Sequence, residues 1–156
     1  MKKNWKLLVV CIAIPLAVGA LSAFLTKDGM QMFETIQMPP LSPPGWIFPV
    51  VWTMLYTFMG ISSYLILTSG ADKDALNDAI STYAYQLTVN FLWPILFFGF
   101  QWFLLSFLWI LLLIFLVVSM IGKFYKICKM AAYLNIPYLV WLCFAAYLNL
   151  TIWYLN

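Results

Sequence analysis

The sequence predicts an all-α integral membrane protein: a five-transmembrane-helix bundle with a long first loop acting as a lid. Of the 156 residues, 65% are hydrophobic and 8% are charged, and the mean hydropathy is +0.96. Soluble domains carry about 25% charged residues. The chain also has room for five apolar segments of about 20 residues, the length that crosses a bilayer. Residues 26–45 interrupt the apolar pattern for longest, and four of them are closely spaced prolines.

We expect a single domain over residues 1–156, with spans at about 7–25, 46–67, 79–98, 102–121 and 131–155. The first apolar segment follows Lys2, Lys3 and Lys6, so it is either a cleaved signal peptide or a true span. We favour a span, because about 19 apolar residues exceed the usual signal-peptide core. Its small residues, such as Ala17 and Gly19, allow close approach of another helix, either within the bundle or in a homodimer.

The connections between the spans differ in character. Prolines fix φ, so the loop at residues 26–45 is expected to be stiff. The loop at 68–78 carries acids that suit the start of the next helix. Residues 99–101 form a very short connection, so the third and fourth spans should be antiparallel neighbours. Residues 122–130 are expected to form a basic loop.

The lysines predict the orientation. Five spans place the termini on opposite sides, and the N-terminal side then carries seven of the eight lysines: Lys2, Lys3, Lys6, Lys73, Lys123, Lys126 and Lys129. Positive charge stays in the cytoplasm. We therefore expect a cytoplasmic N-terminus and an outside C-terminus, in the plasma membrane of a bacterium-type cell.

Composition argues against several functions. Histidine is absent, and Cys11, Cys128 and Cys143 stand singly, so we expect no zinc site, no disulfide framework and no ligated haem. The spans lack ionisable side chains, which argues against a proton-coupled pump. The lysines lie at span ends, which fits membrane orientation better than nucleic-acid binding. No nucleophile–base pair or metal cluster is recognisable, so no ordinary catalytic motif is expected.

Polar and aromatic residues share faces of three predicted helices. Helical spacing places Trp52 and Tyr56 on one face of the second span, Asn90 on a face of the third, and Trp141 and Ala145 on a face of the fifth. Converging faces of this kind would form a cavity for a planar hydrophobic ligand. The alternative is that the aromatic residues mark the membrane interfaces and the amides join helices. Trp52 and Trp141 lie several residues inside their spans, where the interface explanation fits less well.

Residues 39–60, PPLSPPGWIFPVVWTMLYTFMG, resemble the signature of the TspO/MBR family, the translocator proteins, also called tryptophan-rich sensory proteins or peripheral-type benzodiazepine receptors. Residues 85–93 (YQLTVNFLW) and 137–149 (PYLVWLCFAAYLN) extend the resemblance over nearly the whole chain. It implies a five-helix bundle, often dimeric, whose ligand pocket is closed by the first loop. By position, the pocket residues would be Trp52, Tyr56, Asn90, Trp141 and Ala145, with Phe33 in the lid.

The resemblance also implies partners: protoporphyrin IX or a related tetrapyrrole, membrane lipid, and a second copy in a homodimer. The porphyrin would be a ligand rather than a cofactor. We expect a receptor or sensor linked to tetrapyrrole homeostasis. The alternatives are an enzyme that degrades porphyrin with light and oxygen through Trp52 or Trp141, and a transporter of small hydrophobic molecules. Sterol transport is not expected, because no basic residue follows the tyrosines of the last span.

Overall fold

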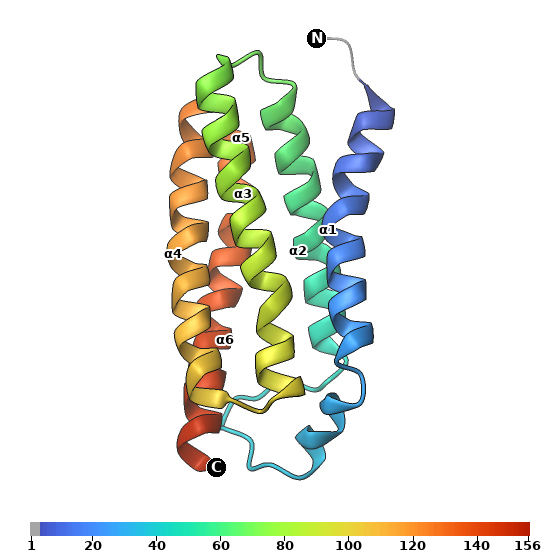
Figure 1. The fold of residues 1–156 in the computed structure, drawn as a ribbon, viewed down its shortest axis with the longest axis vertical. Coiled ribbons are helices and arrows are strands. Elements are labelled where there is room, and N and C mark those ends of the chain that lie inside the picture. Colours follow the sequence, from blue (N-terminus) through green and yellow to red (C-terminus); the bar gives the residue numbers. More distant parts are fainter. Residues whose placement is uncertain (1–3) are drawn as a thin grey trace.

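The computed structural model describes residues 4–156, apart from the side chains of Met30, Met32 and Phe33, and Figure 1 shows its fold. The described part is helical and contains no strand. Its elements are α1 (Trp5–Leu25), the 3₁₀ helix η1 (Gly29–Glu34), α2 (Ile47–Leu67), α3 (Lys73–Pro94), the π-helical turn η2 (Ile95–Gly99), α4 (Phe103–Ile127), α5 (Lys129–Tyr133) and α6 (Ile136–Leu155).

The helices form a closed ring around a shared core. α1 packs on α2, α2 on α5, α5 and α6 on α4, α4 on α3, and α3 on α1. The loop between α1 and α2 lies across the end of the bundle that also holds the C-terminus (Figure 1). This arrangement confirms that the third and fourth predicted spans are neighbours, and it leaves α2, α3 and α6 facing the centre.

Four helical segments are long and apolar enough to cross a membrane: α1, α2, α4 and the combined segment Lys129–Leu155. α3 has a similar length but is less apolar: its first turns carry three charged side chains, and its inward face carries the buried polar side chains Thr82, Gln86 and Asn90. The chain is therefore an all-helical protein with four helices able to span a membrane. The third predicted span, residues 79–98, belongs to a helix that is less apolar than the other four segments.

Several predicted boundaries differ from the structure. α3 begins at Lys73, well inside the expected loop, because the Asp72 carboxylate caps it by accepting from the backbone N–H of Ala75 at 3.2 Å. α4 continues to Ile127, so the expected basic loop at 122–130 is largely helical. Phe124 is completely buried, and its packing keeps this last part of α4 on the core.

The predicted last span, residues 131–155, is divided into α5 and α6. Pro137 lies in the first turn of α6. A proline ring clashes with the carbonyl four residues earlier, here that of Tyr133, where α5 ends. The Asn135 side chain partly replaces the lost helical bonding, since its Nδ2 donates to the Ala131 carbonyl at 3.0 Å and to Ser62 Oγ at 2.8 Å. The break between α5 and α6 is thus stabilised by specific hydrogen bonds, one of which also joins the start of α6 to α2.

Two glycines allow α1 to pack closely on α2. A Cβ at Gly60 would collide with the α1 backbone at Ile12, and a Cβ at Gly19 would collide with the Tyr56 ring. Of the two uses expected for the small residues of α1, close approach within the bundle is thus the one that Gly19 serves.

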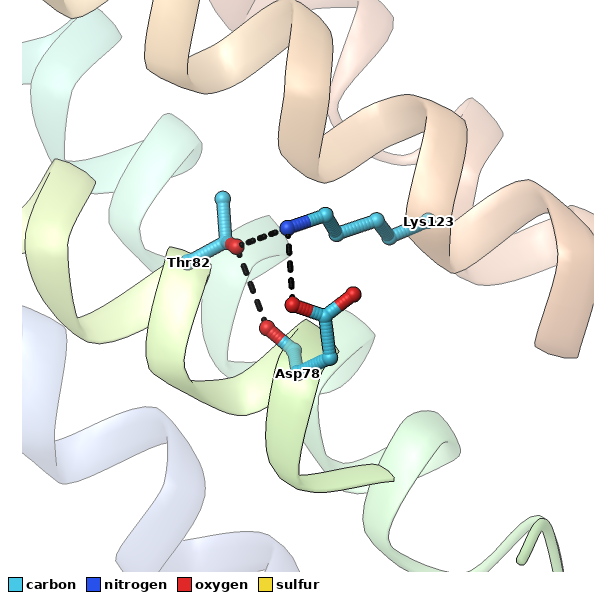
Figure 2. Close-up of polar contacts among 3 residues, drawn as sticks. All are labelled: Asp78, Thr82 and Lys123. Atoms are coloured by element: carbon cyan, nitrogen blue, oxygen red, sulfur yellow. Dashed lines mark hydrogen bonds and ion pairs between the residues drawn. The ribbon is translucent and has the colours of Figure 1, made fainter. Parts of the chain in front are cut away.

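An exposed polar contact joins α3 to α4 at the end away from the proline-rich loop. Lys123 Nζ donates to Asp78 Oδ1 at 3.0 Å and to Thr82 Oγ1 at 2.8 Å, and Thr82 donates to the Asp78 carbonyl at 3.0 Å (Figure 2). Exposed ion pairs contribute at most about 1 kcal/mol. The contact therefore aligns the two helices more than it stabilises them.

Candidate ligand-binding site

A chain of hydrogen bonds crosses the centre of the bundle. The Tyr56 hydroxyl of α2 donates to Asn90 Oδ1 of α3 at 2.8 Å. Asn90 Nδ2 then donates to the Tyr138 hydroxyl of α6 at 2.7 Å, and that hydroxyl donates to Gln86 Oε1 at 2.8 Å. All four side chains are buried. The chain therefore ties three helices together through polar groups that a low-dielectric core makes costly to leave unpaired.

Aromatic rings cover this chain on the side of the loop. The Trp52 ring lies one turn before Tyr56 and stacks on it, with centroids 5.4 Å apart. Trp52 also meets the Tyr138 ring edge-on, at 6.2 Å. Two of the four hydrogen-bonded side chains, Tyr56 and Tyr138, are thus in contact with the Trp52 indole. Offset and edge-on ring pairs of this kind contribute about 0.5–1.5 kcal/mol each.

Trp141 forms the wall between α6 and α2. Its ring meets Phe48 at 5.8 Å and Phe144 at 5.6 Å, and it packs against the same core as Trp52. Its indole Nε1 is buried and has no hydrogen-bond partner among the described residues. The Trp141 ring is therefore held in place by apolar contact alone.

The predicted site residues are placed as follows. Trp52 contacts Tyr56, and Tyr56 contacts Asn90. Trp141 joins the same core from α6, and Ala145 lies half-buried one turn further along that helix. Phe33 belongs to η1 in the loop, and its side chain lies outside the described residues.

Two central residues were not among the predicted site residues. Tyr138 is the hub between Asn90 and Gln86, and Gln86 ends the chain with only the Met59 sulfur, at 3.9 Å, near its Nε2. A signal for each was present: Tyr138 stands three residues before Trp141, and Gln86 four before Asn90, so each shares a helix face with a predicted residue.

Side chains fill the space where we expected a cavity. Tyr56, Asn90 and Tyr138 are buried in contact with one another between α2, α3 and α6. Instead, an open groove of about 590 Å³ lies on the outside, between α2 and α6. Its lining is Val51, Met54, Leu55, Ile136, Pro137, Val140, Trp141 and Phe144. Trp141 therefore separates this outer groove from the aromatic core.

The proline-rich loop closes the end of the bundle. The Tyr147 hydroxyl donates to the Pro40 carbonyl at 2.9 Å. Gln37 and Asn156 exchange two hydrogen bonds of 3.1 Å each, and Pro39 is buried. The described residues contain no group of three or more His, Cys, Asp or Glu side chains that could hold a metal ion. The arrangement thus offers an aromatic, hydrogen-bonding core under a fastened loop.

Comparison with known proteins bears directly on this architecture. A sequence model of the TspO/MBR family matches residues 11–155. The chain belongs to the TspO/MBR family. All of the candidate residues lie within the matched region, so the family assignment covers the hydrogen-bonded chain, the tryptophans and the loop together.

Individual TspO/MBR proteins match the chain over most of their lengths. The tryptophan-rich protein TspO of Chlorobaculum tepidum is 40% identical over 158 residues, covering 100% of this chain and 99% of its own. The translocator protein of Homo sapiens is 32% identical, over 85% of this chain and 79% of its own. The tryptophan-rich sensory protein of Cereibacter sphaeroides is 28% identical, over 100% and 95%.

Proposed function

We propose that this TspO/MBR protein is a membrane receptor or sensor for protoporphyrin IX and similar planar hydrophobic ligands, held between α2, α3 and α6. One observation carries the proposal: the buried chain from Tyr56 through Asn90 to Tyr138 lies beneath the flat ring of Trp52. Sites for small hydrophobic ligands combine apolar, aromatic walls with a few fixed polar groups.

Binding requires a rearrangement of this core, since side chains occupy it in the free protein. In the proposed complex the ligand ring lies between Trp52 and Trp141, and Asn90 donates a hydrogen bond to it. Asn90 then exchanges its bond to the Tyr138 hydroxyl for one to the ligand. Tyr138 keeps Gln86 as a partner, so the exchange leaves no hydroxyl orphaned.

The proposal includes the placement in the membrane. α3 serves as the fifth span, its polar side chains turned to the core, and the proline-rich loop serves as the lid. The N-terminus faces the cytoplasm and the C-terminus faces outside. Support comes from the ends of the bundle, since Lys73, Lys123, Lys126 and Lys129 lie at the end opposite the loop.

The test is a titration with protoporphyrin IX in the dark, following quenching of tryptophan fluorescence of the purified protein in detergent. The double variant Trp52→Phe, Trp141→Phe should bind at least about tenfold more weakly, because two large stacking surfaces are reduced. Trp5→Phe, Trp102→Phe is the matched control: it also removes two indoles, but from exposed positions near helix ends. Equal affinity in the two double variants would contradict the placement.

A second candidate function is light- and oxygen-dependent degradation of the bound porphyrin. It is favoured by the contact of oxidisable rings in the core, since Trp52 touches both Tyr56 and Tyr138. Porphyrin absorbance under illumination should then fall faster with the wild-type protein than with the Trp52→Phe, Trp141→Phe variant at equal porphyrin occupancy. If porphyrin bound to the wild-type protein lost absorbance no faster than free porphyrin, the degradation activity would be refuted and the receptor function alone would remain.

A further inference from the structure

We infer that the ligand enters the core laterally from the bilayer, through the groove between α2 and α6. The Trp141 side chain closes this entrance and swings aside to let the ligand pass. The inference rests on the proposed function for the identity of the ligand. It concerns the route alone: the closed loop end stays fastened while the ligand passes between the two helices.

The groove has the chemistry that a route from hydrocarbon requires. All eight lining residues are apolar, and the groove lies along α2 and α6 within segments apolar enough to span a membrane. A planar hydrophobic ligand concentrates in the bilayer, so it meets this surface before it meets the polar ends of the bundle. Val140, the most outward of these residues, is 64% exposed.

The two helices are held together differently along their length. Near the α5–α6 break, α2 approaches α5 closely, and Ser62 donates to the Ala131 carbonyl at 2.8 Å. Nearer the loop, α2 and α6 meet through aromatic side chains, in the pairs Phe48–Trp141 and Trp52–Tyr138. Rotating rings can open this part of the wall while the backbones stay in place.

Two other tryptophans of the bundle are anchored by indole hydrogen bonds, whereas Trp141 is not. Trp93 donates its indole N–H to Asn149 Oδ1 at 3.1 Å, and Trp109 donates to the Val89 carbonyl at 2.8 Å. Trp141 Nε1 is buried without a partner among the described residues. Swinging its ring outward therefore breaks no indole hydrogen bond.

The loop end is the costlier route. Opening it breaks the Tyr147–Pro40 hydrogen bond and both Gln37–Asn156 bonds. It also exposes Pro39 and separates Ile36 and Met38 from the cluster built on Phe97 and Ile152. The lateral route is therefore favoured. The wall between α2 and α6 is closed by ring contacts, whereas the loop end is closed by hydrogen bonds together with apolar burial.

The test measures the kinetics of protoporphyrin IX binding to the full chain in lipid nanodiscs, in the dark, by stopped-flow quenching. Val51→Phe, Val140→Phe narrows the groove from both sides without altering the core tryptophans. We expect the association and dissociation rates to fall together by about tenfold, leaving the equilibrium affinity within about twofold. Val10→Phe, Val118→Phe is the matched control, placed on exposed positions of α1 and α4, and its rates should equal those of the wild type.

A second variant tests the loop. Tyr147→Phe removes the hydroxyl that binds Pro40, and it should leave the association rate unchanged. A faster association in Tyr147→Phe, or unchanged rates in Val51→Phe, Val140→Phe, would overturn the lateral route. Val140→Phe alone, at an exposed position, serves if the double variant does not fold. Absence of saturable porphyrin binding in the wild type would instead refute the proposed function, so the two failures are distinguishable.

Discussion

Asn90 is the residue on which the core depends, since its amide is both acceptor for Tyr56 and donor to Tyr138. Gln86 of the same helix also accepts from Tyr138, but it reaches α2 only through the long contact of its Nε2 with the Met59 sulfur, at 3.9 Å. Hydrogen bonds between membrane helices contribute modestly on average, about 0.6 kcal/mol. The larger effect is the cost of a buried group left without a partner, about 1–3 kcal/mol.

Asn90→Ala should therefore lower the free energy of unfolding by about 1–3 kcal/mol, because the Tyr56 hydroxyl loses its acceptor in a buried site. Thermal or denaturant unfolding in detergent measures the effect. Thr88→Ala is the control on the same helix: Thr88 is exposed and its hydroxyl bonds within α3, to the Ala84 carbonyl. An equal loss in both variants would show that Asn90 has no special role in the core.

At this scale the sequence predicts which side chains face the core better than it predicts their partners. Helical spacing alone places Trp52, Tyr56 and Asn90 on inward faces, and in the structure Trp52 stacks on Tyr56, which bonds to Asn90. Tyr138 shares a helix face with Trp141, but the sequence does not show that its hydroxyl bonds to both Asn90 and Gln86. Pairing across helices, such as Asn90 with Tyr138, requires knowing which helices face each other.

At the scale of the elements, α1 and α2 are joined by backbone proximity. Gly60 lies against the α1 backbone at Ile12, so any side chain there must push the helices apart. Gly122 of α4 has open space where a Cβ would be. The two glycines have the same intrinsic cost in a helix but opposite surroundings.

The same substitution should thus have opposite effects at these positions. Gly60→Ala is expected to destabilise the protein by about 1–3 kcal/mol through overpacking. Gly122→Ala should stabilise it by up to about 1 kcal/mol, because alanine favours helix over glycine. The melting temperatures of the two variants in the same detergent provide the measurement. If both variants shifted the melting temperature in the same direction, the packing described for α1 and α2 would be contradicted.

The sequence predicts that the long helices exist, and for α1 and α2 it also predicts their first and last residues closely. The errors have physical causes. Lys123 and Lys126 suggested a loop, but their long stems let α4 continue to Ile127 while the charges stay at its end. Pro137 was expected inside one helix, whereas its ring ends α5 four residues earlier. α3 was expected to begin at residue 79, and the cap at Asp72 starts it sooner.

For the whole molecule, the order of helices in the ring decides what the core contains. Apolar faces are alike, so composition cannot tell which of five helices are neighbours; the short turn between α3 and α4 is the one connection that predicts a pair. The ring of helices places the candidate residues of α2, α3 and α6 around one centre. The lysines, by contrast, mark one end of the bundle from the sequence alone, because they cluster at the ends of apolar segments.

The proposed orientation is tested by labelling. In a chain whose three cysteines are replaced by alanine, Gly45→Cys in the loop should react with a membrane-impermeant maleimide in intact cells. Asn77→Cys, exposed in the early turns of α3 at the other end, should react only after the cells are permeabilised. Both substituted positions are exposed, so the reactivity of each cysteine reports the side of the membrane on which it lies. The reverse pattern would invert the orientation.

The modest apolarity of α3 bears on how the protein is made. During synthesis, α3 emerges with Gln86 and Asn90 before their partner Tyr138 exists, and a helix with bare amides is a poor substrate for insertion on its own. The strongly apolar α4 follows after a tight turn, so in the proposed five-span arrangement the two helices would be inserted as a hairpin, aligned at its open end by Lys123 and Asp78. Tyr138 of α6 then completes the hydrogen bonding of Gln86 and Asn90, so the core cannot mature before α6 has been made.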